Sequence, residues 1–289
     1  MSTSPMPLPC LAFHSVHDRS TVLFSLSDKK PIVAAGGDIG ALEKMIICPT
    51  ARGFMLARDP TSLSTFLWSS QSRLKIELPP LGLDVDNDLL IQCNCLLSDK
   101  PTAPGCVVLL AQPDAPLIWF CHVGDGQWEK YEYDIGTMAL PDWDPPEEKV
   151  VICPIAACRG KFYFNSTTTS LDVIDFCGGL AAPVFGSIAV EDTIGECHAK
   201  VFLVESRDQL YMVRLLGVNA SEPYHGATVH RMDFSKRQWC AVDDLGGCTF
   251  LLSIYMNLAP RSPATAGVVC GRIASTSRTV AGKRCRSLT

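Results

Sequence analysis

The chain has 289 residues, 47% of them hydrophobic and 19% charged, so it is long enough to bury a core and is neither disordered nor fibrous. Its 20 Pro and 21 Gly argue against long helices and predict an all-β chain of short elements joined by tight turns. The net charge is -5, but residues 257–289 hold six basic and no acidic residues, so residues 1–256 carry -11 and are a poor match for nucleic acid or an anionic membrane.

Short apolar runs, each closed by Gly, Pro, Asp or Asn, predict strands that come in sets. The first set is a hairpin of residues 21–26 and 31–35, followed by weak helical spacing at 40–47. The next sets place strands at 53–57, 65–68 and 74–78, then at 106–111, 117–123 and 127–133, then at 160–164 and 171–176. The fifth set has four strands, at 200–205, 209–216, 228–234 and 238–242, with turns at 206–208 and 235–237. A sixth run, 248–255, begins another unit.

The units begin at residues 53, 106, 160 and 199, a spacing typical of propeller blades, which repeat every 40 to 50 residues or roughly so. Three units place a large aromatic on a late strand: Trp68, Trp128 and Trp239. We expect these rings to pack between adjacent blades, because one four-stranded sheet cannot bury its own face. A pair of β-sandwiches is the competing architecture.

Four segments carry a family resemblance: VICPIAACRGKFYF at 151–164, KVFLVES at 200–206, LYMVR at 210–214, and VHRMDF at 229–234 leading to Trp239. In this order they resemble the plant KIB-type β-propeller domain family, long described as a domain of unknown function, and its cereal-grass branch above all. The resemblance covers about residues 8–256. It implies an all-β, kelch-like propeller with blades of three to four antiparallel strands, related to F-box substrate receptors of Skp-cullin ubiquitin ligases.

The chain departs from that family plan at both ends. The propeller pattern begins within the first 20 residues or so, which leaves no room for an F-box and argues against a Skp-type adaptor as partner. We therefore predict an N-terminal tail at 1–7, a KIB-type propeller domain at 8–256, and a basic, low-complexity, disordered tail at 257–289, with the propeller incomplete at its C-terminus. The abrupt change of composition favours an alternative reading frame or a retained intron over a genuine variant terminus as the origin of that tail.

No motif predicts a catalytic, cofactor-binding or metal-binding site. The segment 84–88, DVDND, imitates the start of a calcium loop, but Leu89 replaces the required Gly and Cys95 the bidentate Glu, so it is a solvated acidic turn. The glycines of 36–40 lack a phosphate-binding ending. Cys93 with Cys95, Cys153 with Cys158, and Cys197 with His198 lack the spacing of zinc ligands. Cys93 and Cys95 are expected to share a face of a core strand.

Cysteine usage and the N-terminus indicate a reducing compartment. The first 20 residues lack a secretory signal, so the 14 cysteines are predicted to be free thiols in a cytoplasmic or nuclear protein. The least charged stretch, 177–190, is too short and too rich in Gly and Pro to span a membrane.

Three possibilities for the function remain open from the sequence. The favoured class is a non-enzymatic protein-interaction module without cofactors that binds a protein partner through its loops. The alternatives are a small-molecule or glycan binder or an enzyme using the central channel, and a truncated family copy with little activity. The acidic segment 142–148, DWDPPEE, is expected to lie on a loop, where a solvated linker is favoured over a docking site for a basic partner.

Overall fold

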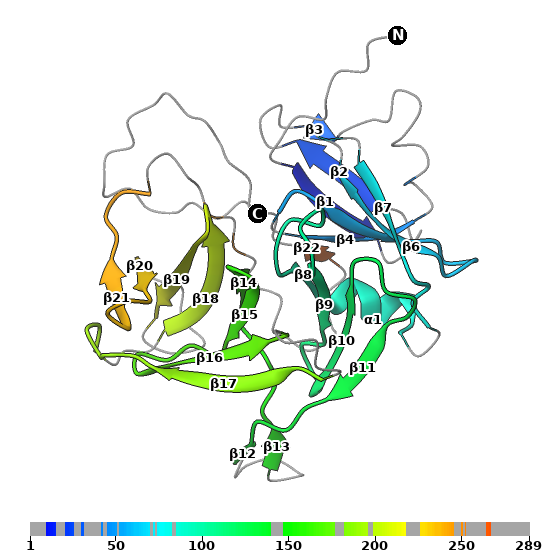
Figure 1. The fold of residues 1–289 in the computed structure, drawn as a ribbon. Helices are drawn as coiled ribbons and strands as arrows, with labels where there is room; N and C mark the ends of the chain where they lie inside the picture. The colour runs from blue at the N-terminus through cyan, green and yellow to red at the C-terminus, as the bar shows by residue number, and fades with distance from the viewer. Residues whose placement is uncertain are drawn as a thin grey trace.

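The computed structural model describes residues 42, 45–50, 52–69, 72, 74–82, 85–139, 147–176, 182–195, 199–217, 226–245, 250 and 252, and the backbone of short strands at 10–15, 21–25, 30–31 and 264–266. These residues form 22 strands and one helix. The strands make five four-stranded sheets and one two-stranded ribbon, and every strand pairing between them is antiparallel (Figure 1). The prediction of an all-β fold is confirmed.

We number the four-stranded sheets as blades I to V along the chain. Blade I consists of β22 (Ala264–Ala266), β1 (Cys10–Ser15), β2 (Thr21–Ser25) and β3 (Lys30–Pro31). Blade II consists of β4 (Ile46–Pro49), β5 (Met55–Arg58), β6 (Thr65–Ser69) and β7 (Leu74–Leu78), and blade III of β8 (Asn94–Leu97), β9 (Val107–Ala111), β10 (Leu117–His122) and β11 (Glu129–Glu132).

Blade IV consists of β14 (Ile155–Cys158), β15 (Lys161–Phe164), β16 (Ser170–Asp175) and β17 (Val184–Ala189), and blade V of β18 (Ala199–Ser206), β19 (Gln209–Leu216), β20 (Gly226–Asp233) and β21 (Gln238–Ala241). The helix α1 (Asn87–Gln92) lies between blades II and III in sequence, and the ribbon of β12 (Thr137–Ala139) and β13 (Glu147–Lys149) between blades III and IV.

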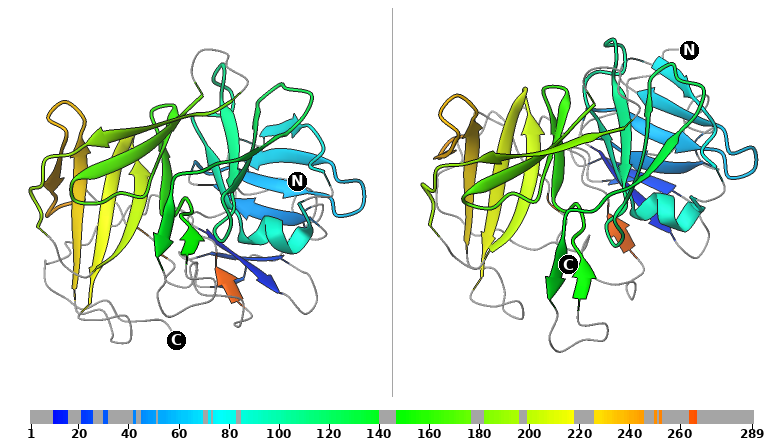
Figure 2. Two further views of the ribbon diagram at one scale, coloured as in Figure 1. Left: turned by 90° about the horizontal axis from the view of Figure 1, so that it is seen from below. Right: turned by 60° about the horizontal axis from the view of Figure 1, so that its bottom comes forward.

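The blades follow one another around a common centre. In Figure 1 they run from blade I at the upper right through blades II, III and IV to blade V at the left, and Figure 2 shows the same succession from two further directions. Blades II to V are meanders in which consecutive strands pair, whereas blade I joins both ends of the described chain, because Phe13 of β1 pairs with Ala266 of β22. The described strands form a propeller whose ring of blades is not closed.

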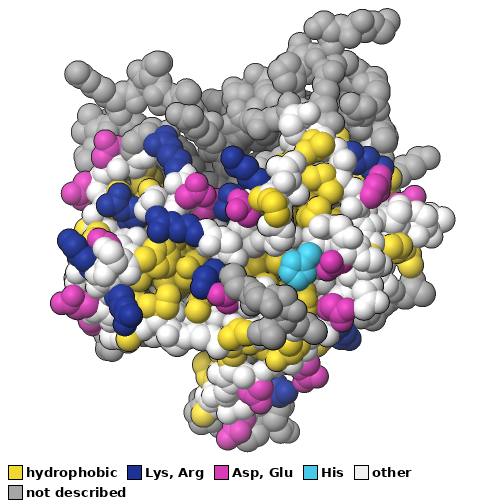
Figure 3. Space-filling model, viewed as in Figure 1, with side chains coloured by type: hydrophobic (Ala, Val, Ile, Leu, Met, Phe, Trp, Pro, Cys, Tyr) yellow, Lys and Arg dark blue, Asp and Glu magenta, His cyan; other side chains and the backbone are white. Residues whose placement is uncertain are grey.

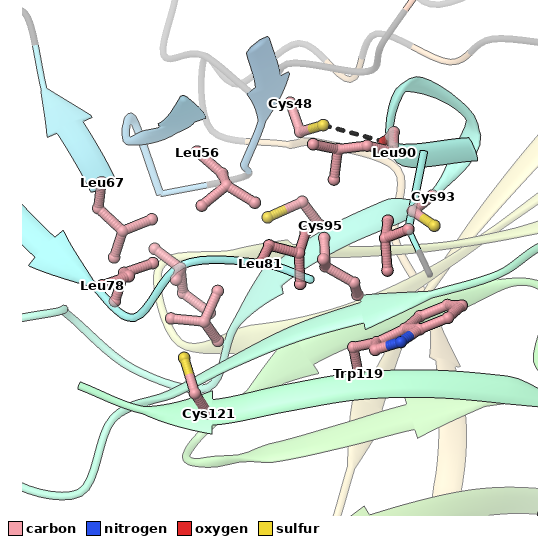
Figure 4. Packing of buried hydrophobic residues seen from close by; sticks show 14 of the residues in the cluster. Cys48, Leu56, Leu67, Leu78, Leu81, Leu90, Cys93, Cys95, Trp119 and Cys121 are labelled. Atoms are coloured by element: carbon pink, nitrogen blue, oxygen red, sulfur yellow. Dashed lines mark hydrogen bonds between the residues drawn. The ribbon is translucent and has the colours of Figure 1, made fainter. Parts of the chain in front are cut away.

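Hydrophobic cores lie between consecutive blades. One core joins blades II and III, one blades III and IV, and one blades IV and V, while a smaller one covers the opposite face of blade II. Figure 4 shows the first of them, in which Leu56 and Leu67 of blade II meet Cys95, Trp119 and Cys121 of blade III. This is the packing expected of propeller blades, each of which buries its faces only against its neighbours.

Two of the three predicted inter-blade aromatics lie at cores between blades. Trp239 is 2% exposed in the core between blades IV and V, and Trp128 packs against the core between blades II and III. Trp68 is 8% exposed and lies on the other face of blade II. Their positions differ slightly, because Trp68 belongs to a third strand, whereas Trp239 belongs to a fourth strand and Trp128 directly precedes one.

The eight cysteines in the described part of the chain are free thiols, as the sequence predicted for them. Five of them, Cys48, Cys93, Cys95, Cys106 and Cys121, belong to the core between blades II and III. The Cys48 thiol donates to the carbonyl oxygen of Leu90 at 3.0 Å (Figure 4), and burial raises the pKa of Cys48 to about 12. These side chains act as small hydrophobic groups that stay protonated at neutral pH.

Half of the segment 40–47, with its weak helical spacing, lies outside the described residues. Its last two residues belong to a strand, because β4 begins at Ile46, and the first three residues of β4 are buried. The helix in the described part of the chain is α1. Its first residues, Asn87 and Asp88, belong to the segment that the sequence predicted to be a solvated acidic turn. Asp86 caps it by accepting the amide hydrogen of Leu89 at 2.6 Å, and Leu90 points into the core. Cys93 ends this helix and only Cys95 is in β8, although both thiols reach the same core.

Candidate functional site

The first strands of blades II to V lie around the centre of the molecule, where β4 contacts β8, β8 contacts β14, and β14 contacts β18. Each of these inner strands leads into a turn that carries charged side chains. These turns come from segments far apart in sequence but contact one another. We call Arg52, Asp99, Arg159, Arg207 and Asp208 the central turn cluster.

Two of the turns are two-residue hairpin loops with left-handed backbone conformations. In blade IV, Arg159 and Gly160 have φ values of 51° and 80° and connect β14 to β15. In blade V, Arg207 and Asp208 have φ values of 54° and 58° and connect β18 to β19. Positive φ at both central residues is the type I′ pattern, which matches the twist of a hairpin but is usually built from Asn and Gly. Arg at such positions costs conformational energy.

Arg52 brings three blades together. It lies in the turn between β4 and β5, and its Nη1 is 4.0 Å from Asp99 Oδ1 of blade III and 3.9 Å from Asp208 Oδ1 of blade V. The Arg52 side chain is only 13% exposed, whereas those of Asp99 and Asp208 are 53% and 74% exposed. A largely buried cation thus faces two carboxylates that remain open to solvent.

Hydrogen bonds join the turns directly. The Arg159 Nε donates to the backbone oxygen of Asp208 at 2.9 Å, which connects blade IV to blade V. The amide of Gly160 donates to the backbone oxygen of Ser98 at 3.2 Å, which connects blade IV to blade III. The Arg159 guanidinium also lies 5.3 Å from the ring centre of Phe234. These contacts hold the turns in fixed relative positions.

Two buried titratable groups lie behind the cluster. Glu205 is 9% exposed and accepts the amide hydrogen of Asp208 at 2.8 Å. Burial raises the pKa of the Glu205 carboxyl, against the lowering effects of that hydrogen bond and of Arg52. Burial and then Glu205 raise the pKa of Cys158 to about 11, so this thiol is protonated at neutral pH and is a poor nucleophile.

The central turn cluster presents exposed side chains of both charges in fixed positions. Arg159, Arg207, Asp99 and Asp208 are all exposed. On the face in Figure 3, Lys and Arg side chains gather mainly over blade V at the left and alternate there with Asp and Glu. Guanidinium and carboxylate groups fixed in this way can form charge-assisted hydrogen bonds with polar groups of a protein surface.

No pattern in the sequence pointed to this cluster. The turn predicted at 206–208 is confirmed by the structure, but nothing in the sequence related it to the turns of the other blades. The available signal was an arginine at the turn of two hairpins, Arg159 before Gly160 and Arg207 before Asp208.

Within the described residues, no group of three or more His, Cys, Asp or Glu side chains is arranged to hold a metal ion. Cys93 and Cys95 lie in a hydrophobic core, and Cys153 and Cys158 precede and end β14. Cys197 and His198 lie outside the described residues, as do the glycines of 36–40 and the unit predicted at 248–255, apart from residues 250 and 252.

The acidic segment 142–148 is only partly described. Glu147 and Glu148 belong to β13, whose ribbon with β12 extends away from the blades at the bottom of Figure 1. All six residues of the ribbon strands are exposed, and Lys149 bonds Glu132 of blade III at 3.2 Å. No helix in the described part of the chain is long and apolar enough to cross a membrane.

The family model described as KIB1-4 beta-propeller matches residues 23–268 of this chain. That match includes β22, which lies beyond residue 256, the predicted end of the domain. No curated protein matches the sequence.

Three solved structures resemble the chain weakly. The streptogramin B lyase structure has 10% identity and a TM-score of 0.35, with 85% of this chain and 87% of that one covered. The Myceliophteria thermophila Cps50 (Swd1) β-propeller domain has 8% identity and a TM-score of 0.32, with 84% and 88% covered. The tricorn protease has 11% identity and a TM-score of 0.32, with 77% of this chain but only 20% of that one covered.

Proposed function

This chain belongs to the KIB1-4 β-propeller family, and we propose that it is a non-enzymatic protein-interaction module that holds a partner protein at the central turn cluster. In this proposal it acts in the cytoplasm or nucleus, as a relative of F-box substrate receptors.

The observation that carries the proposal is the joining of turns from four blades at one surface. Arg52, Asp99, Arg159 and Asp208 come from blades II, III, IV and V in turn, and hydrogen bonds or ion pairs connect them. A surface whose groups are already fixed loses little conformational entropy when a partner binds. The strained backbone of Arg207 supports the same view, because strain of this kind is commonly retained where a side chain must point in a set direction.

Affinity capture with matched variants tests the proposal. We expect the full chain to retain a specific protein partner and to lose it on Arg159→Gln combined with Asp208→Asn. Lys236→Gln is the matched control, because Lys236 is exposed in a turn of blade V but lies outside the cluster. Equal partner recovery by the cluster variant and the control would refute the assignment of the surface. Turnover of a small substrate that depends on single Asp or His residues would refute the non-enzymatic role.

A further inference from the structure

A second group of polar side chains lies on blade V, away from the central turn cluster. Arg214 pairs with Thr228 across β19 and β20, and Met212 pairs with His230. Met232 pairs with Trp239 across β20 and β21. Because directly paired residues and alternate residues of one strand share a face of the sheet, Arg214, Thr228, His230 and Trp239 all lie on the face that packs against blade IV. We call these four residues the blade V polar group.

Within the described part of the chain, three atoms of this group are buried without a hydrogen-bond partner: Thr228 Oγ1, His230 Nδ1 and Trp239 Nε1. His230 is 8% exposed and Trp239 2% exposed, so solvent does not compensate them. Buried polar atoms in folded proteins are almost always paired, and an unpaired donor costs stability. Three such atoms on one face of one blade indicate an acceptor that binds among them.

The electrostatics of the group favour an acceptor with negative charge. Arg214 is 5% exposed, and its Nη2 donates to the backbone oxygen of Gly195 at 3.3 Å. Burial, and then the charge of Arg214, lower the pKa of His230, so the imidazole is neutral near pH 7 and able to donate from one ring nitrogen.

The carboxylate of Asp192, which interacts with Arg214, does not supply this acceptor. It accepts the amide hydrogens of Ile194 and Gly195 at 3.1 and 2.9 Å and contacts the Thr168 hydroxyl at 3.4 Å. None of Thr228 Oγ1, His230 Nδ1 and Trp239 Nε1 forms a hydrogen bond with this carboxylate.

We propose that the blade V polar group is a binding site for a small oxyanion, a carboxylate or a phosphate, which accepts from the Trp239 indole, the Thr228 hydroxyl and the His230 ring beside the Arg214 charge. An oxyanion offers several lone pairs to converging donors, and a neighbouring guanidinium stabilises its charge. Nothing in this proposal depends on a partner at the central turn cluster.

The test follows the Trp239 indole N–H by nuclear magnetic resonance of the full chain, with the resonance assigned from its loss in Trp239→Phe. Inorganic phosphate and succinate are added separately, at an ionic strength held constant with chloride. We expect one of them to give a saturable shift of this resonance, and the anion that does so identifies the ligand as a phosphate or a carboxylate.

Thr228→Val separates a binding site from a structural group, because valine keeps the shape of threonine and removes the hydroxyl. We expect it to weaken anion binding about tenfold, the effect of losing one hydrogen bond to a charged group, and to raise the unfolding temperature of the unliganded protein. The matched control is Thr65→Val, since the Thr65 hydroxyl is already satisfied by the oxygen of Pro79 at 2.7 Å. This control should lower the unfolding temperature and leave anion binding unchanged.

Two results would overturn the proposal. If neither phosphate nor succinate shifts the Trp239 resonance, the unpaired atoms bind water alone. If Thr228→Val binds the anion as the unchanged protein does, the anion lies elsewhere.

Discussion

The indole Nε1 of Trp128 in blade III donates to the backbone oxygen of Pro79, 2.8 Å away, at the end of blade II. The Thr65 hydroxyl of blade II donates to the same oxygen at 2.7 Å. One carbonyl therefore takes one hydrogen bond from its own blade and one from the next, and it stays satisfied when either donor is removed.

This shared acceptor predicts non-additive effects on stability. Trp128→Phe and Thr65→Val should each lower the free energy of unfolding by about 1 kcal/mol, the net value of one hydrogen bond. The double variant should lose more than the sum, because the Pro79 oxygen is then left without a partner. Urea unfolding of the four proteins measures the coupling, and strict additivity would contradict the prediction.

Arg58 is a buried cation held by backbone oxygens. It is 1% exposed, and it donates to the carbonyl groups of Val85, Leu81 and Gly82 in the segment before α1. We expect Arg58→Met to lower the free energy of unfolding by roughly 3 kcal/mol, because it leaves these oxygens without their donor. A variant as stable as the unchanged chain would show that the segment finds other donors.

Relieving the strain in the turn at Arg207 and Asp208 of blade V should stabilise the protein and weaken binding of the partner. Replacing Arg207 and Asp208 by Asn and Gly suits a type I′ turn and should raise the free energy of unfolding by about 1 kcal/mol. The same change removes two charges of the central turn cluster and should reduce partner recovery. Recovery that is unchanged in the stabilised variant would separate the turn from the binding surface.

Glu205 predicts a pH dependence of stability. Its pKa is raised in the folded protein, mainly by burial, so the ionised form is disfavoured there. The contribution of this group to stability is complete below the unfolded carboxyl pKa, about 4.3, and is lost as the pH rises through the folded value. Glu205→Gln should therefore be more stable than the unchanged chain at neutral pH, with the advantage disappearing in acid. Thermal unfolding across this range measures it, and an advantage that grows in acid would reverse the sign.

Strand β22 gives residues 257–289 a structural role that can be tested. It pairs with β1 through Phe13 with Ala266, His14 with Thr265, and Ser15 with Ala264. Removal of residues 257–289 should lower the unfolding midpoint by circular dichroism, because β1 loses its partner on one side. Identical midpoints for the full chain and residues 1–256 would show that this pairing adds nothing to stability.

Blade V was predicted almost completely from the sequence, whereas blades II, III and IV were each missing their first strand and blade IV was also missing its last, β17. The first two strands of blade V, β18 and β19, are each eight residues long. The turn between them, at Arg207 and Asp208, is clearly marked in the sequence. The inner strands β4, β8 and β14 have only four residues each, and three of the four are buried in β4 and β14. In β4 and β14, burial on both faces removes the alternation of polar and apolar residues by which a strand is recognised, and β8 is too short for its alternation to stand out.

The sequence by itself determined the secondary-structure class, the spacing of the blades and the family, because short strands, turn residues and family segments are local properties of the chain. Only the tertiary structure decided which distant residues meet. Arg159 reaches Asp208 across 49 positions, and the unpaired atoms of Thr228, His230 and Trp239 share one face of blade V because three strands pair in a particular register. Contacts of this kind depend on how the sheets pack, and no local pattern in the sequence encodes them.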